Sequence, residues 1–106
     1  MLAMFEHTQG ISGVTFNKTI SVFCPLGNEY YTAHINVEFV PDKVMMDYLD
    51  EEAYFKKLSG GRLIIEDLVA DVYNRYENLY KAKYVKVTVF AENAAHFPVK
   101  VYKESK

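Results

Sequence analysis

The chain has 106 residues, half of them hydrophobic, and carries 12 lysines and arginines against 14 aspartates and glutamates. This length favours one compact domain, and the hydrophobic content excludes a disordered chain. A formal net charge of −2 lacks the basic excess typical of proteins that bind phosphate backbones, so nucleic acid is not the expected partner. One cysteine permits no internal disulfide, and no signal peptide or long apolar run is recognisable, so we expect a cytoplasmic protein without a membrane partner.

A β-hairpin is predicted in the first half of the chain. Residues 1–13 show no sustained period and are set apart as an N-terminal segment, ahead of a single domain over residues 14–106. Apolar and polar side chains alternate from Val14 to Cys24, Pro25–Glu29 holds turn residues, and Tyr31–Val40 alternates again. The second strand has an apolar face and a polar one, the latter formed by Thr32, His34, Asn36 and Glu38.

Two helices are predicted after the hairpin. Pro41-Asp42 ends the strand, and because aspartate is a favoured helix start, Val44–Leu58 is predicted as the first helix. Ser59-Gly60-Gly61 would close it. Its proposed apolar stripe is Met45, Tyr48, Leu49, Phe55 and Leu58. The second helix has a clearer apolar stripe, formed by Ile65, Leu68, Val69, Val72, Tyr73 and Tyr76.

Two more strands complete the pattern, Tyr84–Ala91 and Pro98–Tyr102, joined by Glu92–His96. The order strand, strand, helix, helix, strand, strand predicts an α+β fold: an antiparallel four-stranded sheet with two helices on one face. The uncovered face would meet either water or the lumen of an assembly. Its side chains are polar: Thr32, His34, Asn36, Glu38, Lys86 and Thr88.

This ββααββ order resembles the unit of the tunnelling-fold (T-fold) superfamily. Members of that superfamily join their sheets edge to edge into barrels and bind purine- or pterin-like rings between subunits. The resemblance covers almost the whole chain, and it implies a homo-oligomer that binds a small heterocyclic ligand at its subunit interfaces.

The hairpin Cys24–Lys43 resembles, in spacing and flanking residues, the nitrile reductase of queuosine biosynthesis and the archaeosine amidinotransferase. In those enzymes a cysteine attacks the nitrile of 7-cyano-7-deazaguanine, and a glutamate opening the second helix holds the ring. Cys24 and Glu66 match these positions. The sequence departs from the family at Tyr31, where the family has a proton-donating aspartate, and at Ile65, where it has a histidine.

Pterin enzymes of the same superfamily offer a second resemblance. Val44–Tyr48 is similar to a Gly-Met-Val-x-Asp-Phe stretch of 6-pyruvoyl or 6-carboxy tetrahydropterin synthases, and Val89–Asn93 to their Glu-Thr pterin anchor, which implies a role for Glu92. His34 falls near their His-Gly-His pair, but the zinc triad is not recognisable, so no cofactor is predicted from the residues, and zinc is kept only as the cofactor that this resemblance implies. Ile65–Leu68 also resembles the Ile-Glu-Thr-Leu of dihydroneopterin aldolase.

The chemistry of these residues suits such a site. A carboxylate such as Glu66 accepts both hydrogens from the N–H and NH₂ edge of a guanine-type ring, although a glutamate also simply favours a helix start. Cys24 would react as a thiolate, whereas a lone cysteine is more often a small buried hydrophobe. With Tyr31 in place of the acid, Glu29 or Glu38 is the remaining proton source.

His34 and Glu92 also have ordinary alternatives. His34 would serve as a hydrogen-bonded histidine of the polar face, since His7 and His96 provide no short metal-ligand spacing with it. Glu92 would be a polar loop residue. We predict Cys24 and His34 as catalytic residues, Glu66 and Glu92 as substrate-binding residues, and no metal site.

Three functions follow from this sequence. The first is an enzyme of 7-deazaguanine metabolism with Cys24 as nucleophile, and the second is a pterin enzyme of the synthase or aldolase kind. The third is a ligand-binding or structural subunit without catalysis, because partner residues of two families are missing. A transfer RNA substrate would require assembly to gather Lys56, Lys57, Lys81, Lys83 and Lys86 into one patch.

Overall fold

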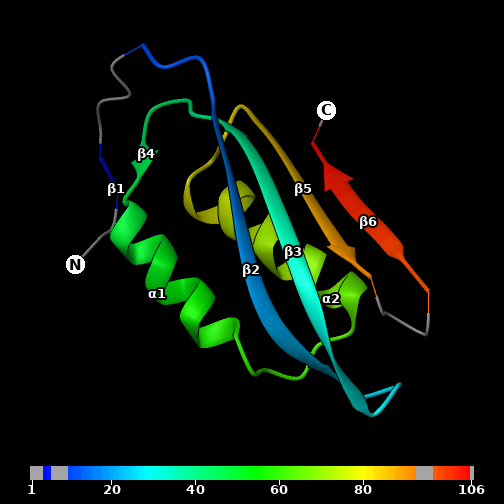
Figure 1. The fold of residues 1–106 in the computed structure, drawn as a ribbon. Coiled ribbons are helices and arrows are strands. Elements are labelled where there is room, and N and C mark those ends of the chain that lie inside the picture. Colours follow the sequence, from blue (N-terminus) through cyan, green and yellow to red (C-terminus); the bar gives the residue numbers. More distant parts are fainter. Residues whose placement is uncertain (1–3, 6–9, 93–96, 106) are drawn as a thin grey trace.

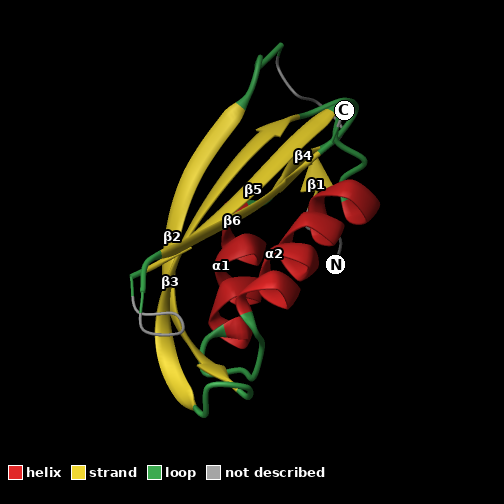
Figure 2. Cartoon of the chain, turned by 90° about the vertical axis from the view of Figure 1, so that its right-hand side faces the viewer, coloured by secondary structure: helices red, strands yellow, loops and turns green. Residues whose placement is uncertain are grey.

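The computed structural model describes residues 4–5, 10–92 and 97–105 of the chain. Two helices lie on one face of an antiparallel sheet, which confirms the predicted α+β architecture (Figure 1, Figure 2). The helices are α1 (Tyr48–Leu58) and α2 (Ile65–Asn74). The sheet contains, in spatial order, β2 (Val14–Cys24), β3 (Glu29–Val40), β5 (Tyr84–Ala91) and β6 (Val99–Glu104).

The core lies between the sheet and the helices. Alternation along β3 and β5 turns one set of side chains toward the helices, where Val37 and Val87 pair across the strands and are fully buried. Removing this apolar surface from water is the main force that holds the layers together. The predicted stripe of the second helix is confirmed, because every member is buried: Ile65, Leu68, Val69, Val72, Tyr73 and Tyr76.

The first helix begins later than predicted. Met45–Met46 forms a short strand, β4, which pairs with β1 (Met4–Phe5) inside the N-terminal segment. The side chain of Asp47, and not that of Asp42, accepts the N–H of Leu49 at 2.9 Å and caps the helix. The predicted apolar stripe is wrong at its start for this reason: Leu49 is 77% exposed, and Tyr48 is also exposed.

A buried polar cluster, missed by the sequence, joins the two helices. After Asn74 the helix continues as a π-helical segment, Arg75–Leu79. The buried Glu51 carboxylate of α1 accepts hydrogen bonds from the hydroxyls of Tyr76 and Tyr80 and from the Arg75 guanidinium, 2.7 Å away at its nearest. The predicted role of Tyr73, Tyr76 and Tyr80 in packing is therefore confirmed by their burial.

The remaining elements lie close to their predicted positions. β5 has the predicted bounds, whereas the last strand is Val99–Glu104 and not Pro98–Tyr102. In the hairpin turn Asn28 adopts a left-handed φ of 56°, and its N–H donates to the carbonyl of Cys24 at 2.7 Å. Within the described part of the chain, no helix is long and apolar enough to cross a membrane.

Candidate functional site

The only cysteine lies at the end of β2, where the hairpin turn begins. Cys24 is partly buried and packs against the edge of the core, on the face of the sheet that carries the helices. Its Sγ accepts the N–H of Gly27 at 3.4 Å, and across the hairpin its backbone pairs with Glu29. The thiol is therefore held between the hairpin turn and the core.

A short connection between the helices fastens this end of the sheet. We call Gly60–Leu63 the strap. It runs parallel to the end of β2 and makes three backbone hydrogen bonds to it, of which two join Phe23 to Gly61 and Leu63 at 2.8 and 3.0 Å. The third runs from the N–H of Gly60 to the carbonyl of Ser21 at 2.7 Å. The strap thus connects the strand that ends in Cys24 to the start of α2.

Tyr31 connects the strap to the second strand. Its side chain is 4% exposed, and its hydroxyl donates to the carbonyl of Leu63 at 2.7 Å. Burial raises the pKa of the Tyr31 phenol, and the negative charges of Cys24, Glu66 and Asp67 raise it further. Its hydrogen bond to Leu63 places the phenol beside the residue that leads, through Ile64, into α2.

Glu66 stands in the first turn of α2 and is exposed. No residue of the described chain forms a hydrogen bond to its carboxylate. Ile64 precedes the helix and offers no side-chain cap, so the positive end of the helix dipole is left to Glu66 and Asp67. This carboxylate is available to a ligand.

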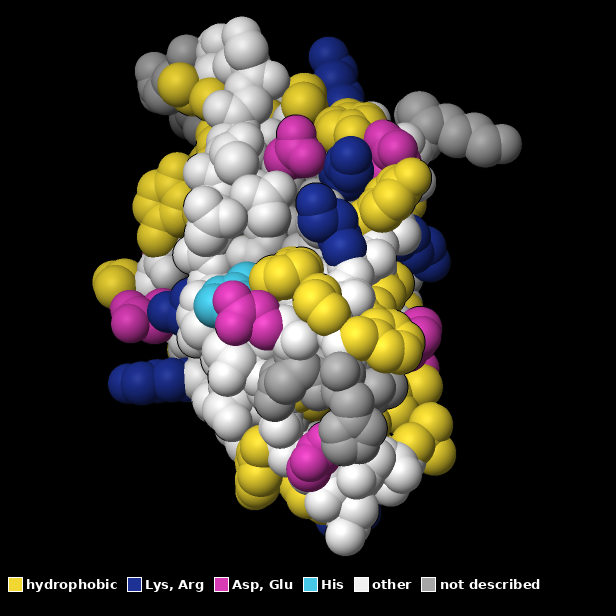
Figure 3. Space-filling model, turned by 45° about the vertical axis from the view of Figure 1, so that its right-hand side comes forward, with side chains coloured by type: hydrophobic (Ala, Val, Ile, Leu, Met, Phe, Trp, Pro, Cys, Tyr) yellow, Lys and Arg dark blue, Asp and Glu magenta, His cyan; other side chains and the backbone are white. Residues whose placement is uncertain are grey.

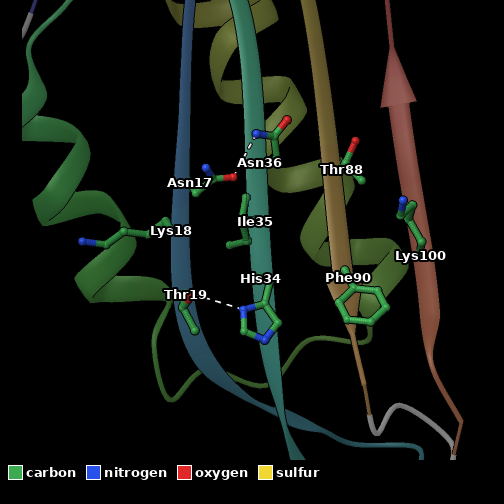
Figure 4. Close-up of a pocket in the computed structure, with 9 residues that line it drawn as sticks. All are labelled: Asn17, Lys18, Thr19, His34, Ile35, Asn36, Thr88, Phe90 and Lys100. Carbon is green, nitrogen blue, oxygen red and sulfur yellow. Dashed lines mark hydrogen bonds between the residues drawn. The ribbon is translucent and has the colours of Figure 1, made fainter.

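The uncovered face of the sheet carries a second candidate site. An open cavity of about 510 Å³ lies over β2, β3, β5 and β6 (Figure 4). Figure 3 shows that basic, acidic and hydrophobic side chains are interspersed over the surface on this side of the molecule. The lining residues are Asn17, Lys18, Thr19, His34, Ile35, Asn36, Thr88, Phe90 and Lys100.

His34 is held in this cavity by its neighbours across the strands. Its Nδ1 lies 3.3 Å from the hydroxyl of Thr19, and its ring centroid lies 6.1 Å from that of Phe90. Beside it, the Asn36 amide donates to the Asn17 side chain at 2.9 Å. A hydrogen-bonded histidine of the polar face, one of the two roles considered for His34, agrees with this geometry.

The predicted site residues fall into two groups. Cys24 and Glu66 lie at the hairpin end, on the side of the helices, whereas His34 lies on the opposite face, where it pairs with Thr19 on β2. Glu92 is exposed and follows β5 directly after Ala91, at the end nearest Phe90. The structure does not bring His34 to Cys24, and the roles of all four residues remain predictions.

The described residues do not provide the ligands that the zinc site of a pterin synthase would need. The described ranges contain no group of three histidine, cysteine, aspartate or glutamate side chains arranged to hold a metal ion. His7 and His96 lie outside the described residues.

Sequence reasoning missed two features of the hairpin end. Arg62 of the strap lies over the ring of Phe23, with its Cζ 4.9 Å from the centroid, and Tyr30 meets the same ring edge-on at 5.1 Å. It also missed the contact between Tyr31 and Leu63. In the sequence, the Gly60-Gly61 pair indicated only that the chain turns here. It did not indicate these contacts, because they join segments that are distant along the chain.

The fold of this chain is similar to that of the archaeosine synthase QueF-Like, whose crystal structure in the apo form superposes with a TM-score of 0.82. The alignment covers 91% of this chain and 95% of that chain, at 22% sequence identity. No protein-family model matches the chain, and no curated protein matches it in sequence. The likeness to the archaeosine synthase establishes the architecture: the chain has the tunnelling fold that its element order predicted.

Proposed function

We propose that this protein binds a guanine-like heterocycle and is an enzyme of 7-deazaguanine metabolism, with Cys24 as the nucleophile and Glu66 as the ring-binding residue. The observation that carries the proposal is the set of contacts at Leu63, which lies three residues before Glu66: its carbonyl accepts the Tyr31 hydroxyl, and its N–H donates to Phe23, the neighbour of Cys24. The similarity of the fold to an archaeosine synthase supports the proposal at a coarser level.

Ring recognition would depend on the open carboxylate of Glu66. A guanine-type ring presents an N–H and an adjacent NH₂ on one edge, and a carboxylate accepts both in a bidentate, charge-assisted pair. An adenine-type ring has no such pair of donors, so it should bind much more weakly.

The proposed covalent step is the addition of a thiolate to a nitrile. The Sγ of Cys24 forms a bond to the nitrile carbon, one π bond of the C≡N group opens, and the nitrogen takes up a proton to give a thioimidate. Tyr31 is an unsuitable acid because its proton is already donated to Leu63. We propose Glu29, which pairs with Cys24 across the hairpin, as the proton source, since Glu38 pairs with Lys86 farther along β3.

The direct test mixes the protein with 7-cyano-7-deazaguanine. Wild type should develop the absorbance band of a thioimidate and gain the mass of one ligand per modified chain in intact mass spectrometry. Cys24→Ala should show neither change. Equal spectra for wild type and Cys24→Ala would refute the covalent role of Cys24.

A matched pair of acidic residues tests ring binding. Glu66→Gln should weaken the binding of 7-deazaguanine by about tenfold or more, because hydrogen bonds to a charged group contribute about 1.5 to 3 kcal/mol. Asp67→Asn changes the adjacent exposed acid of the same helix turn and should bind nearly as wild type does. If both variants weaken binding equally, the helix end attracts the ligand only through its charge.

Binding without turnover is the second candidate, favoured by the tyrosine at the position of the family's acid. It predicts a stable complex with 7-deazaguanine and no product from any nitrile or pterin substrate. Detected turnover would remove this candidate. For a pterin synthase, elemental analysis of purified protein would have to find about one zinc per chain.

We also propose that the protein assembles through its sheet edges. β2 and β6 are the outer strands of the sheet, and edge strands are surfaces on which another chain can pair. Native mass spectrometry should then show a homo-oligomer together with any retained ring. A monomer at micromolar concentration would contradict assembly.

A further inference from the structure

Leu63 of the strap is fixed on both sides by its backbone. Its N–H donates to the carbonyl of Phe23 on β2 at 3.0 Å, and its carbonyl accepts the hydroxyl of Tyr31 on β3 at 2.7 Å. Tyr31 itself pairs with Val22, close to the cysteine end of β2. One tyrosine hydroxyl therefore joins the second strand to the residue that leads into α2.

The strap provides the shortest covalent route from this anchor to the ring-binding residue. From Leu63 the chain continues through Ile64 directly into α2, where Glu66 lies in the first turn. Backbone hydrogen bonds also hold Gly61, whose carbonyl accepts the N–H of Phe23 at 2.8 Å and whose N–H donates to the carbonyl of Leu58 at 2.9 Å. A shift of Leu63 would consequently move the start of α2 relative to the end of β2.

The same contact makes Tyr31 a poor proton donor. Its hydroxyl hydrogen is engaged with the Leu63 carbonyl, its side chain is buried, and the nearby acidic groups of Cys24, Glu66 and Asp67 oppose ionisation. A donor role would break the contact that holds the strap, and it would place a phenolate beside other negative groups.

We infer that Tyr31 is a positioning residue, whose hydroxyl sets the spacing between the Cys24 thiol and the Glu66 carboxylate by holding the strap at Leu63. The effect of Tyr31 on catalysis rests on the proposed function. Its effect on the position of the strap depends only on the hydrogen bond to Leu63, which needs no ligand. The two parts are therefore tested separately.

Hydrogen exchange tests the effect of Tyr31 on the strap without any ligand. In Tyr31→Phe, amides of the peptide that contains the strap should exchange about tenfold faster than in wild type, because a buried carbonyl has lost its donor. Tyr84→Phe removes a hydroxyl bonded to Glu104 at the far end of β5 and should leave the strap unchanged. Unchanged exchange of the strap in Tyr31→Phe would overturn the inference.

Single-turnover kinetics with 7-cyano-7-deazaguanine test the effect of Tyr31 on catalysis. Tyr31→Phe should lower the rate of thioimidate formation at saturating ligand by about tenfold, with less than about threefold change in affinity and an unchanged shape of the pH–rate profile. Loss of the alkaline limb in Tyr31→Phe would instead identify Tyr31 as the acid and overturn the inference.

Tyr31→Asp separates the two roles further, because it installs the family's acid but cannot reach Leu63 in the same way. A positioning role predicts slower thioimidate formation in this variant, whereas an acid role predicts a rate equal to or above that of wild type. If wild type forms no thioimidate at all, the proposed function fails, while the exchange experiment still decides whether Tyr31 holds the strap.

Discussion

Two glutamates of this chain show opposite uses of a carboxylate. Glu51, in the first turn of α1, is 4% exposed and accepts hydrogen bonds from Arg75, Tyr76 and Tyr80. Glu66, in the first turn of α2, is exposed and receives no hydrogen bond from the described residues. Both lie in the first turn of a helix, yet among the described residues only Glu51 receives hydrogen bonds from other side chains.

The difference indicates which acid serves the fold and which is open to a ligand. A buried carboxylate costs folding free energy unless every oxygen is paired, and Glu51 meets this condition with an arginine and two phenols. The Arg75 guanidinium is itself held by Asp50 at 2.6 Å and lies over the ring of Tyr54. At Glu66 the described chain supplies no such partners, and the exposed carboxylate can hydrogen-bond with water or, under the proposed function, with a ligand that has two adjacent donors.

The largest effect is expected from removing the buried carboxylate of Glu51, both of whose oxygens accept hydrogen bonds. Glu51→Ala should lower the free energy of unfolding by about 3 to 5 kcal/mol, because it leaves two buried hydroxyls without their acceptor and the partly buried Arg75 guanidinium with Asp50 as its remaining acidic partner. Urea denaturation followed by circular dichroism measures this change. The exposed neighbour provides the control, since Glu52→Ala should stay within about 0.5 kcal/mol of wild type. A loss below 1 kcal/mol for Glu51→Ala would mean that the cluster does not hold the helices together.

The phenols of this cluster predict a dependence of stability on alkaline pH. Burial raises the pKa of Tyr76, and the charge of Glu51 raises it further, so the folded protein keeps this proton when the unfolded chain loses it near pH 10. The stability due to Tyr76 is therefore intact below pH 10 and declines above it, by about 1.4 kcal/mol per pH unit. Urea titrations between pH 9 and 11 should show a smaller decline for Tyr76→Phe. Equal slopes would contradict the assignment.

At the hairpin end, the expected cost is smaller and comes from a steric clash between a new side chain and the backbone. Gly61→Ala should destabilise the protein by about 1 to 3 kcal/mol, because the new Cβ would lie 2.9 Å from the Leu58 carbonyl oxygen. Thermal unfolding measures the loss, and hydrogen exchange should locate it in the strap. Gly27→Ala is the matched control, because its Cβ would make only ordinary contacts, the nearest at 3.7 Å from the Cys24 sulfur. Similar losses in both variants would show that strap geometry is not the cause.

Local hydrophobic periodicity was sufficient to predict most of the fold. The alternation of Tyr84–Ala91 predicted β5 with the bounds that the structure has, and the stripe of α2 is buried throughout. The start of α1 was predicted wrongly because Met45–Met46 is compatible with either helix or strand. Its pairing with Met4–Phe5, a partner far away in the sequence, decides for the strand.

The candidate site was less accessible to sequence reasoning. Cys24 and Glu66 were proposed from a family resemblance, whereas their connection through Tyr31 and Leu63 is a contact between distant segments that no local pattern records. Glu51 was equally hidden, because in the sequence it is one acid among several on an amphipathic helix. Its partners Arg75 and Tyr76 belong to the π-helical segment that follows α2, and Tyr80 comes directly after that segment, whose occurrence the sequence did not indicate.

The smallest effect on stability is expected from replacing Glu66, whose carboxylate is exposed. Glu66→Gln should change the free energy of unfolding by less than about 0.5 kcal/mol, because the side chain is exposed and contributes only through the helix dipole. The same variant should lose ligand affinity by tenfold or more, so one substitution separates binding from folding. Urea denaturation beside a ligand titration measures both quantities. A loss of stability above 1 kcal/mol with unchanged affinity would instead assign Glu66 to the start of α2, as the helix-forming residue that its position alone would suggest.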